Sequence, residues 1–319
     1  MDKSKSYTSW IAVLWMAVAL ILVPESRLLA ASDPNPGPVS DSILQQQRDS
    51  MLFKLNMQYL NGVNDNGTPF ELISLIEEIL ELDPTLHNQW FNLGLENIKI
   101  KEYNRALEAL TKGLELYPTY DNPTLAQIYI SISFCYHETG RYQQEIAILD
   151  SSSQIFPDHP GIVGRYVISF HDRVRYTEAD HYLTQLVRIL RSEGHNESDI
   201  AFYLGRLYMN SDYLTAEKHF RIAYQYDPEN IEKLGALAWV LIQNALKIDE
   251  GMAMIEQAIK ADPTNAVFLH QQGYGYYVKG NLEDALFNLY NARDLYQLYS
   301  FELLSHIEMV EQAIASLEN

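Results

Sequence analysis

The sequence contains only one cysteine, Cys135, and few basic residues, with 23 Lys and Arg against 42 Asp and Glu. A single thiol excludes an intramolecular disulfide and leaves no cysteine cluster for zinc or an iron–sulfur centre. The formal net charge of −19 repels phosphate groups, which argues against nucleic acid or an anionic membrane surface as the main ligand. We therefore expect packing to supply the stability and expect no nucleic-acid partner.

The sequence patterns that carry common chemistry are also missing. There is no H-E-x-x-H, no G-x-S-x-G and no glycine-rich phosphate loop followed by lysine and serine or threonine. Of the nine histidines, His171 and His181 lie among polar residues without a ligand partner at i+4, and the carboxylates follow helix surfaces instead of gathering around a pocket. The sequence predicts a protein that is not an enzyme and that holds no metal and no cofactor.

The amino terminus predicts export. An apolar run from Trp10 to Val23 follows two lysines and ends before Pro24, which is typical of a signal peptide over residues 1–30. A proline-rich stretch follows and predicts a linker over residues 31–40. We expect a periplasmic or secreted protein, or one anchored in the inner membrane if the apolar run is not cleaved; only then is the membrane a partner.

Residue pairs that end in proline recur at regular intervals along the rest of the chain. Five residue pairs that end in proline follow one another at intervals of 34, 39, 71 and 35 residues. Proline stops a helix because it lacks an N–H group and clashes with the preceding turn, so this spacing predicts a helix-turn-helix repeat. The pairs are Asp83-Pro84, Tyr117-Pro118, Phe156-Pro157, Asp227-Pro228 and Asp262-Pro263.

Other residue types recur between the prolines with the same period. The clearest unit has Trp90, Leu93, Gly94, Ala106 and Pro118. This pattern resembles the tetratricopeptide repeat family, whose signature is W-x2-L-G-x2-Y, then A-x3-F, then P. The resemblance implies an all-α, right-handed α-solenoid of six to seven helix-turn-helix repeats with a C-terminal capping helix.

The resemblance also gives domain boundaries. Residues 87–295 are predicted to form the repeats, preceded by a degenerate hairpin at 41–86 and followed by the capping helix at 296–319. A repeat unit without a terminal proline, near residue 195, predicts a division of the array there. Small residues are expected where paired helices cross, because close approach leaves no room for larger ones. The predicted repeat-packing residues are Gly94, Ala106, Gly205, Ala216, Gly273 and Ala285.

The family further implies a concave groove lined by the first helix of each repeat. The groove residues are mostly apolar or aromatic, which favours a peptide or amphipathic helix of another protein, with aromatic anchors such as Trp239. Only Arg206 suits a carboxylate, so a carboxylate clamp is not expected. The groove residues are Phe91, Leu95, Ile130, Phe134, His137, Ile168, His171, Phe202, Arg206, Met209, Trp239, His270, Tyr274 and Tyr277.

These expectations favour a non-enzymatic, exported scaffold that binds or assembles envelope proteins through an aromatic concave groove. An alternative from a different class stays open, because aromatic rings also stack on sugars. In that case the chain is a carrier, or an accessory subunit of an enzyme or of a secretion system such as polysaccharide export. Its groove then binds a glycan or a small apolar ligand.

Overall fold

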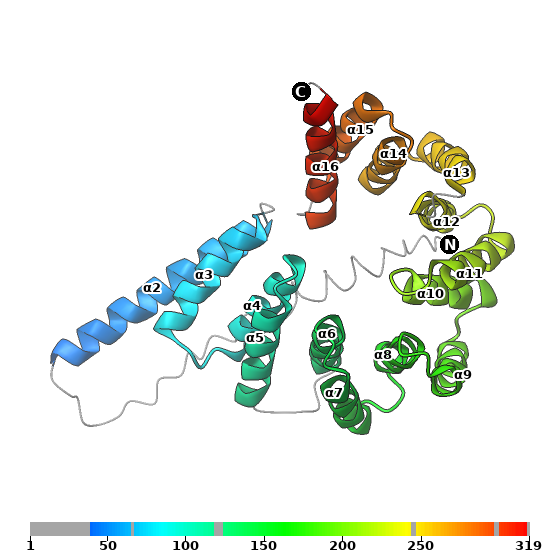
Figure 1. The fold of residues 1–319 in the computed structure, drawn as a ribbon. Helices are drawn as coiled ribbons and strands as arrows, with labels where there is room; N and C mark the ends of the chain where they lie inside the picture. The colour runs from blue at the N-terminus through cyan, green and yellow to red at the C-terminus, as the bar shows by residue number, and fades with distance from the viewer. Residues whose placement is uncertain (1–38, 65–66, 118–123, 244–246, 297–299, 318–319) are drawn as a thin grey trace, which may run out of the picture. The chain divides into compact units, whose positions relative to one another are not determined.

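The computed structural model describes residues 39–64, 67–117, 124–243, 247–296 and 300–317, and this part of the chain contains fifteen helices and no strand (Figure 1). The predicted all-α fold is therefore confirmed. The predicted signal peptide and most of the predicted linker lie outside the described residues. Within them, no helix is long and apolar enough to cross a membrane.

Successive helices form antiparallel hairpins, each with a first and a second helix. There are seven hairpins, and a single helix, α16, follows the last one. They are α2 (Val39–Asn64) with α3 (Pro69–Leu82), α4 (His87–Lys99) with α5 (Tyr103–Leu116), α6 (Thr124–Glu138) with α7 (Tyr142–Ile155), α8 (Pro160–His171) with α9 (Tyr176–Ser192), α10 (Glu197–Tyr208) with α11 (Tyr213–Tyr226), α12 (Ile231–Gln243) with α13 (Ile248–Ala261), α14 (Ala266–Val278) with α15 (Leu282–Leu295), and finally α16 (Phe301–Leu317).

Local sequence explains where the second helices begin and end. α3 starts with a capping box, in which the Thr68 hydroxyl accepts from the backbone N–H of Glu71 and the Glu71 carboxylate accepts from the Thr68 N–H. Pro69 at the first helical position needs no hydrogen-bond partner for its nitrogen. The second helices end directly before the predicted proline-containing pairs, at Leu82, Leu116, Ile155, Tyr226 and Ala261.

The predicted packing residues lie where paired helices come close. A Cβ atom on Gly94 would lie 2.4 Å from Cγ of Leu110, and one on Gly205 would lie 2.6 Å from Cδ1 of Phe220. A Cβ atom on Gly273 would lie 2.8 Å from Cγ of Leu289. Side chains of any size at these glycines would force the two helices of a hairpin apart. The three alanines of the set, Ala106, Ala216 and Ala285, are fully buried.

Buried polar contacts join first helices that are one repeat apart. The ammonium group of Lys233 on α12 is buried and donates to Ser198 Oγ and Asp199 Oδ1 on α10, each at 2.9 Å. It also donates to Asp227 Oδ2 at the end of α11, again at 2.9 Å. Because every donor of this buried cation faces an acceptor, the contact fixes one hairpin on the next without leaving an unpaired charge.

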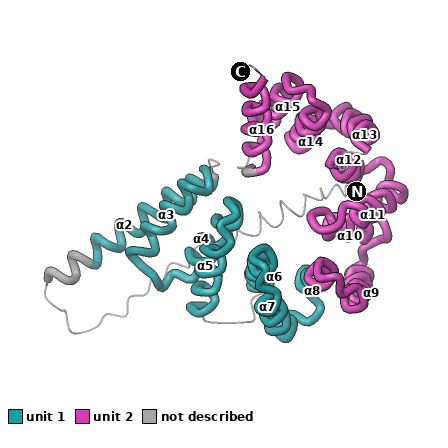
Figure 2. The backbone as a smooth tube through the Cα atoms, in the orientation of Figure 1, with its two compact units in different colours: residues 1–165 teal, residues 166–319 magenta. Residues whose placement is uncertain are grey.

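The chain divides into two compact units, residues 1–165 and residues 166–319 (Figure 2). The division lies inside α8 and not near residue 195, where the sequence predicted it. The segment without a repeat-ending proline instead continues α9 to Ser192. The division lies close to Val167, where the matching positions of α4, α10 and α14 carry Gly94, Gly205 and Gly273.

Candidate protein-binding surface

The predicted groove residues lie on first helices, except Met209, which directly follows α10, and burial separates them into two groups. Four of them are buried: Phe91, Ile168, Trp239 and His270. The others keep part of their surface accessible: Leu95, Ile130, Phe134, His137, His171, Phe202, Arg206, Met209, Tyr274 and Tyr277.

Phe91 and Ile168 are core residues, and their assignment to a partner-binding surface is corrected. The Phe91 side chain is 2% exposed and lies against Gly113, where an added Cβ atom would come within 2.4 Å of its ring. Its ring also contacts Tyr117 at a centroid distance of 5.9 Å. Ile168 is 6% exposed. Helical spacing alone could not show which neighbouring helix covers these two side chains.

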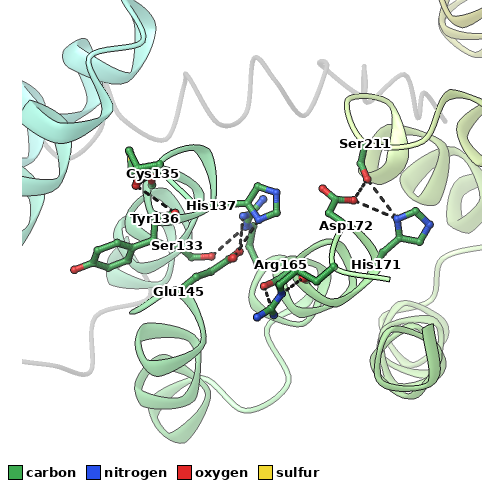
Figure 3. A network of polar contacts seen from close by, with 12 residues as sticks. Ser133, Cys135, Tyr136, His137, Glu145, Arg165, His171, Asp172 and Ser211 are labelled. Atoms are coloured by element: carbon green, nitrogen blue, oxygen red, sulfur yellow. Dashed lines mark hydrogen bonds and ion pairs between the residues drawn. The ribbon is translucent and has the colours of Figure 1, made fainter. Parts of the chain in front are cut away.

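In the first unit, the polar groove position His137 belongs to a buried network (Figure 3). The Glu145 carboxylate on α7 is fully buried, and Arg165 Nη2 on α8 donates to its Oε1 at 2.8 Å. His137 Nδ1 lies 3.1 Å from Glu145 Oε2, and Arg165 Nε donates to Ser133 Oγ at 3.1 Å. These groups link the consecutive helices α6, α7 and α8. Their main role is therefore structural.

The apolar groove positions of this unit are also engaged in internal contacts. The Phe134 ring meets Tyr103 edge to face at 5.7 Å, and the Arg165 guanidinium lies 5.7 Å from the centroid of the same ring. The Ile130 side chain covers Gly161, where an added Cβ atom would approach it to 2.6 Å. Ile130 and Phe134 are therefore engaged mainly in contacts within the first unit.

In the second unit, aromatic and histidine side chains from three successive first helices meet. Trp239 on α12 contacts Tyr274 on α14 at 5.3 Å, and Tyr274 stacks on His306 of α16 at 4.3 Å. His270 Nε2 on α14 lies 2.9 Å from Nδ1 of His306. We call Trp239, His270, Tyr274 and His306 the inner aromatic cluster. Trp239 and His270 form its buried base, at 7% and 4% exposure, and Tyr274 and His306 are only partly covered.

His306 was missed by the sequence analysis, which treated α16 only as a closing helix. A usable signal was present, because His306 follows His270 by 36 residues, close to one repeat period. A residue one period after a first-helix position is expected beside it on the next first helix. α16 thus acts as the first helix of a further repeat and extends the aromatic surface by one position.

More accessible side chains continue this surface on α10 and α14. Phe202 and Arg206 lie on α10, and Met209 is the C-cap residue that directly follows it. The ring centroids of Tyr277 and Tyr274 are 6.2 Å apart. Burial lowers the pKa of Arg206, although the nearby Glu232 carboxylate opposes this. The guanidinium remains charged at neutral pH, and it lies 5.9 Å from the Phe202 ring. We call Phe202, Arg206, Met209, Tyr274 and Tyr277 the inner face.

The buried histidine of the inner aromatic cluster predicts a loss of stability in acid. Burial, and next the charge on His306, lower the pKa of His270 to about 3. An unfolded histidine takes up its proton near pH 6.5, so below that pH the unfolded chain binds more protons. This contribution is complete above pH 6.5 and decreases as the pH falls toward 3. From pH 7 to 5 we expect a loss of about 2 kcal/mol.

Urea denaturation of His270→Gln at both pH values checks this. The glutamine amide still reaches Nδ1 of His306 but does not titrate, so the loss between pH 7 and 5 should shrink by most of that amount. His181→Gln, at an exposed histidine, is the matched control and should keep the loss. Equal acid sensitivity in both variants would contradict the assignment.

A group of serine, histidine and aspartate residues in the second unit (Figure 3) has the composition of a hydrolytic triad but not its hydrogen-bond directions. The Ser211 hydroxyl donates to the Asp172 carboxylate, and its oxygen lies 3.5 Å from His171 Nδ1, which is itself 3.2 Å from Asp172 Oδ1. His171 Nε2 lies 3.5 Å from Asp212 Oδ2. A nucleophilic serine instead passes its proton to the histidine. Asp212 is the N-cap of α11, accepting from the N–H groups of Leu214 and Thr215. The group therefore ties the end of α8 to the start of α11.

The Cys135 thiol and the side chains that could bind a metal ion were two further candidates for chemistry. Burial raises the pKa of the Cys135 thiol to about 12, so the nucleophilic thiolate is not formed at neutral pH. Among the described residues, no three His, Cys, Asp or Glu side chains gather closely enough to hold a metal ion.

The hairpins and their spacing define an all-α repeat protein, and comparison with known proteins gives its family. Residues 90–120 match the family model of the tetratricopeptide repeat. This match covers one repeat, and the structure shows the same hairpin before and after it. The chain therefore contains a tetratricopeptide repeat within an array of similar helix hairpins, a fold that serves as a scaffold for protein–protein interaction. No curated protein matches the sequence.

Solved structures of the same class resemble this chain. A tetratricopeptide repeat protein from Parabacteroides merdae is 15% identical with a TM-score of 0.47, and the match covers 82% of this chain and 99% of that one. YrrB, described as a TPR protein with an unusual peptide-binding site, is 18% identical with a TM-score of 0.34, covering 73% and 97%. PilF of Pseudomonas aeruginosa is 17% identical with a TM-score of 0.41, covering 70% and 96%.

Proposed function

We propose that this protein is a non-enzymatic, exported scaffold that binds a segment of another protein on the inner face of its second unit. The observation that carries the proposal is the inner aromatic cluster with the accessible residues beside it. Aromatic side chains bury a large area at little cost in conformational entropy, and they are enriched among the residues that dominate binding energy.

The inner face is also held in place before binding. Trp239 and His270 are buried beneath Tyr274, and the hydrogen bond between His270 and His306 links α14 to α16. Side chains that are already ordered lose less entropy when a partner arrives, so more of the contact energy appears as affinity. An amphipathic helix or extended peptide with several apolar side chains suits this surface, since it would cover Phe202, Met209 and Tyr277 together.

The proposal is tested by two matched double variants. Phe202→Ala with Tyr277→Ala removes two partly exposed rings from the inner face. Tyr226→Ala with Phe287→Ala removes two rings from second helices, where these side chains are 66% and 67% exposed. We expect capture of the protein partner by the inner-face variant to fall about tenfold or more, measured by quantitative affinity purification from envelope extracts.

The control variant should capture the partner as the wild type does, and both variants should keep their circular dichroism spectra. Loss of capture by the control alone would place the binding surface on the second helices. Displacement of the bound partner by a synthetic amphipathic helix supports a protein ligand. Displacement by an oligosaccharide, and not by the helix, would favour the carrier alternative.

Export is the part of the proposal that rests on sequence alone. It is supported by the apolar run from Trp10 to Val23 and by the prolines that follow it. Mass spectrometry of the mature amino terminus tests it: a start shortly after residue 30 fits a periplasmic or secreted scaffold. An intact amino terminus in a membrane fraction fits an anchored one, and an intact one in the cytoplasm contradicts export.

A further inference from the structure

The first helix of the first hairpin is longer than the helix that supports it. α2 (Val39–Asn64) has 26 residues and α3 (Pro69–Leu82) has 14, and α2 extends past the end of α3 in Figure 1. Every side chain from Gln45 to Met51 is exposed. A short helical segment without tertiary packing is only marginally stable in water. Packing against a second surface would therefore stabilise this part of α2.

The two sides of α2 differ in what covers them. Leu52, Leu55 and Tyr59 belong to or pack against the core cluster shared with α3. On the opposite side, Phe53 is 70% exposed and Met57 is 41% exposed, four residues further along the helix. Ser50 precedes Phe53 by three residues, so these three positions form one stripe at the spacing of a two-helix coiled coil. The stripe has no covering helix among the described residues.

Charged residues flank the stripe on both sides. Asp49 lies along one edge and Lys54 along the other, and both are exposed. Asp49 accepts a hydrogen bond from Gln45 Nε2, and neither Asp49 nor Lys54 forms an ion pair with another described residue. In a parallel pair of identical helices, flanking residues five positions apart face each other across the interface. An antiparallel pair would instead set each charge near its own copy.

We propose that α2 pairs in parallel with α2 of a second copy of this chain. The pair buries Phe53 and Met57 of both copies and sets Asp49 of each copy against Lys54 of the other. The occupant is a second copy because an identical helix offers a Lys54 for each Asp49 and an Asp49 for each Lys54. This inference does not depend on the inner face, which lies in the other unit of the chain.

Single-cysteine variants test the pairing in the full chain. In a parallel pair each stripe position lies opposite itself, within disulfide distance. Ser50→Cys and Met57→Cys, expressed separately and oxidised with copper phenanthroline, should each give a disulfide-linked dimer on a non-reducing gel. The wild type, with only the buried Cys135, should stay monomeric. So should the control Ser74→Cys, at an exposed position of α3.

A charge exchange then tests the register. In the Ser50→Cys background, Asp49→Lys or Lys54→Asp alone should slow dimer formation about fivefold, the effect of losing two exposed ion pairs. The double exchange, Asp49→Lys with Lys54→Asp, should restore the rate. Cross-linking at only one of the two stripe positions would overturn the parallel arrangement, and cross-linking at neither would overturn the pairing. No recovery in the double exchange would overturn the proposed register.

Discussion

Replacing Arg165 with methionine is expected to lower the free energy of unfolding by about 3–5 kcal/mol. Arg165 Nη2 lies 2.8 Å from Oε1 of Glu145, whose carboxylate is fully buried. Without the guanidinium, the buried carboxylate loses this charged hydrogen-bond donor while it stays out of water, which costs free energy. His137 Nδ1, at 3.1 Å, compensates for only part of this loss. Urea denaturation followed by circular dichroism measures the difference.

An exposed ion pair supplies the control for this measurement. Arg105 pairs with Glu77 in the same unit, but their side chains are about half exposed, so Arg105→Met should cost less than about 1 kcal/mol. Removing both buried partners, with Arg165→Met and Glu145→Leu, should recover most of the stability because no uncompensated charge remains. If Arg165→Met costs no more than Arg105→Met, the buried network does not hold the three helices together.

Replacing Trp239 with alanine should cost about 3–5 kcal/mol as well, because it empties a large volume in the second unit. The Trp239 side chain is 7% exposed and contacts Tyr274, His270 and His306. The sequence alone suggested an anchor that a partner touches. The structure instead makes Trp239 the base on which the partner-facing rings rest. Its loss should therefore weaken binding through stability.

Thermal unfolding separates these two roles of Trp239. Trp239→Ala should lower the melting temperature strongly, Trp239→Phe less so, and Phe287→Ala, at an exposed ring of α15, by almost nothing. A Trp239→Ala protein with unchanged stability but lost partner binding would show that the tryptophan is a direct contact.

The fold could be predicted from the sequence because its signals are local and repeated. A proline stops a helix wherever it occurs, so the ends of α3 and α13 at Leu82 and Ala261 follow from the residues beside them. Small residues recur at one period for the same physical reason in every hairpin, as the close contact between Gly94 and Leu110 illustrates. Each copy of the pattern supports the others, which makes the repeat visible without an alignment.

The candidate site was only partly predictable, because burial depends on neighbours that are distant in the sequence. Phe91 and Tyr274 were both predicted on the groove side of first helices, yet Phe91 packs against Gly113 of the next helix and is buried, while Tyr274 keeps part of its surface accessible. The network around Glu145 escaped notice because its members lie on three helices and share no motif. His306 was detectable by its period, but only if α16 is treated as part of the array.

Site-specific photo-crosslinking in living cells tests the central claim most directly. A photoreactive phenylalanine analogue is placed at Tyr277 on the inner face, and separately at Phe287 on a second helix. We expect a discrete cross-linked product with another protein from position 277 and none from position 287. Products from position 287 alone would contradict the claim that the first helices of the second unit form the working surface of this protein.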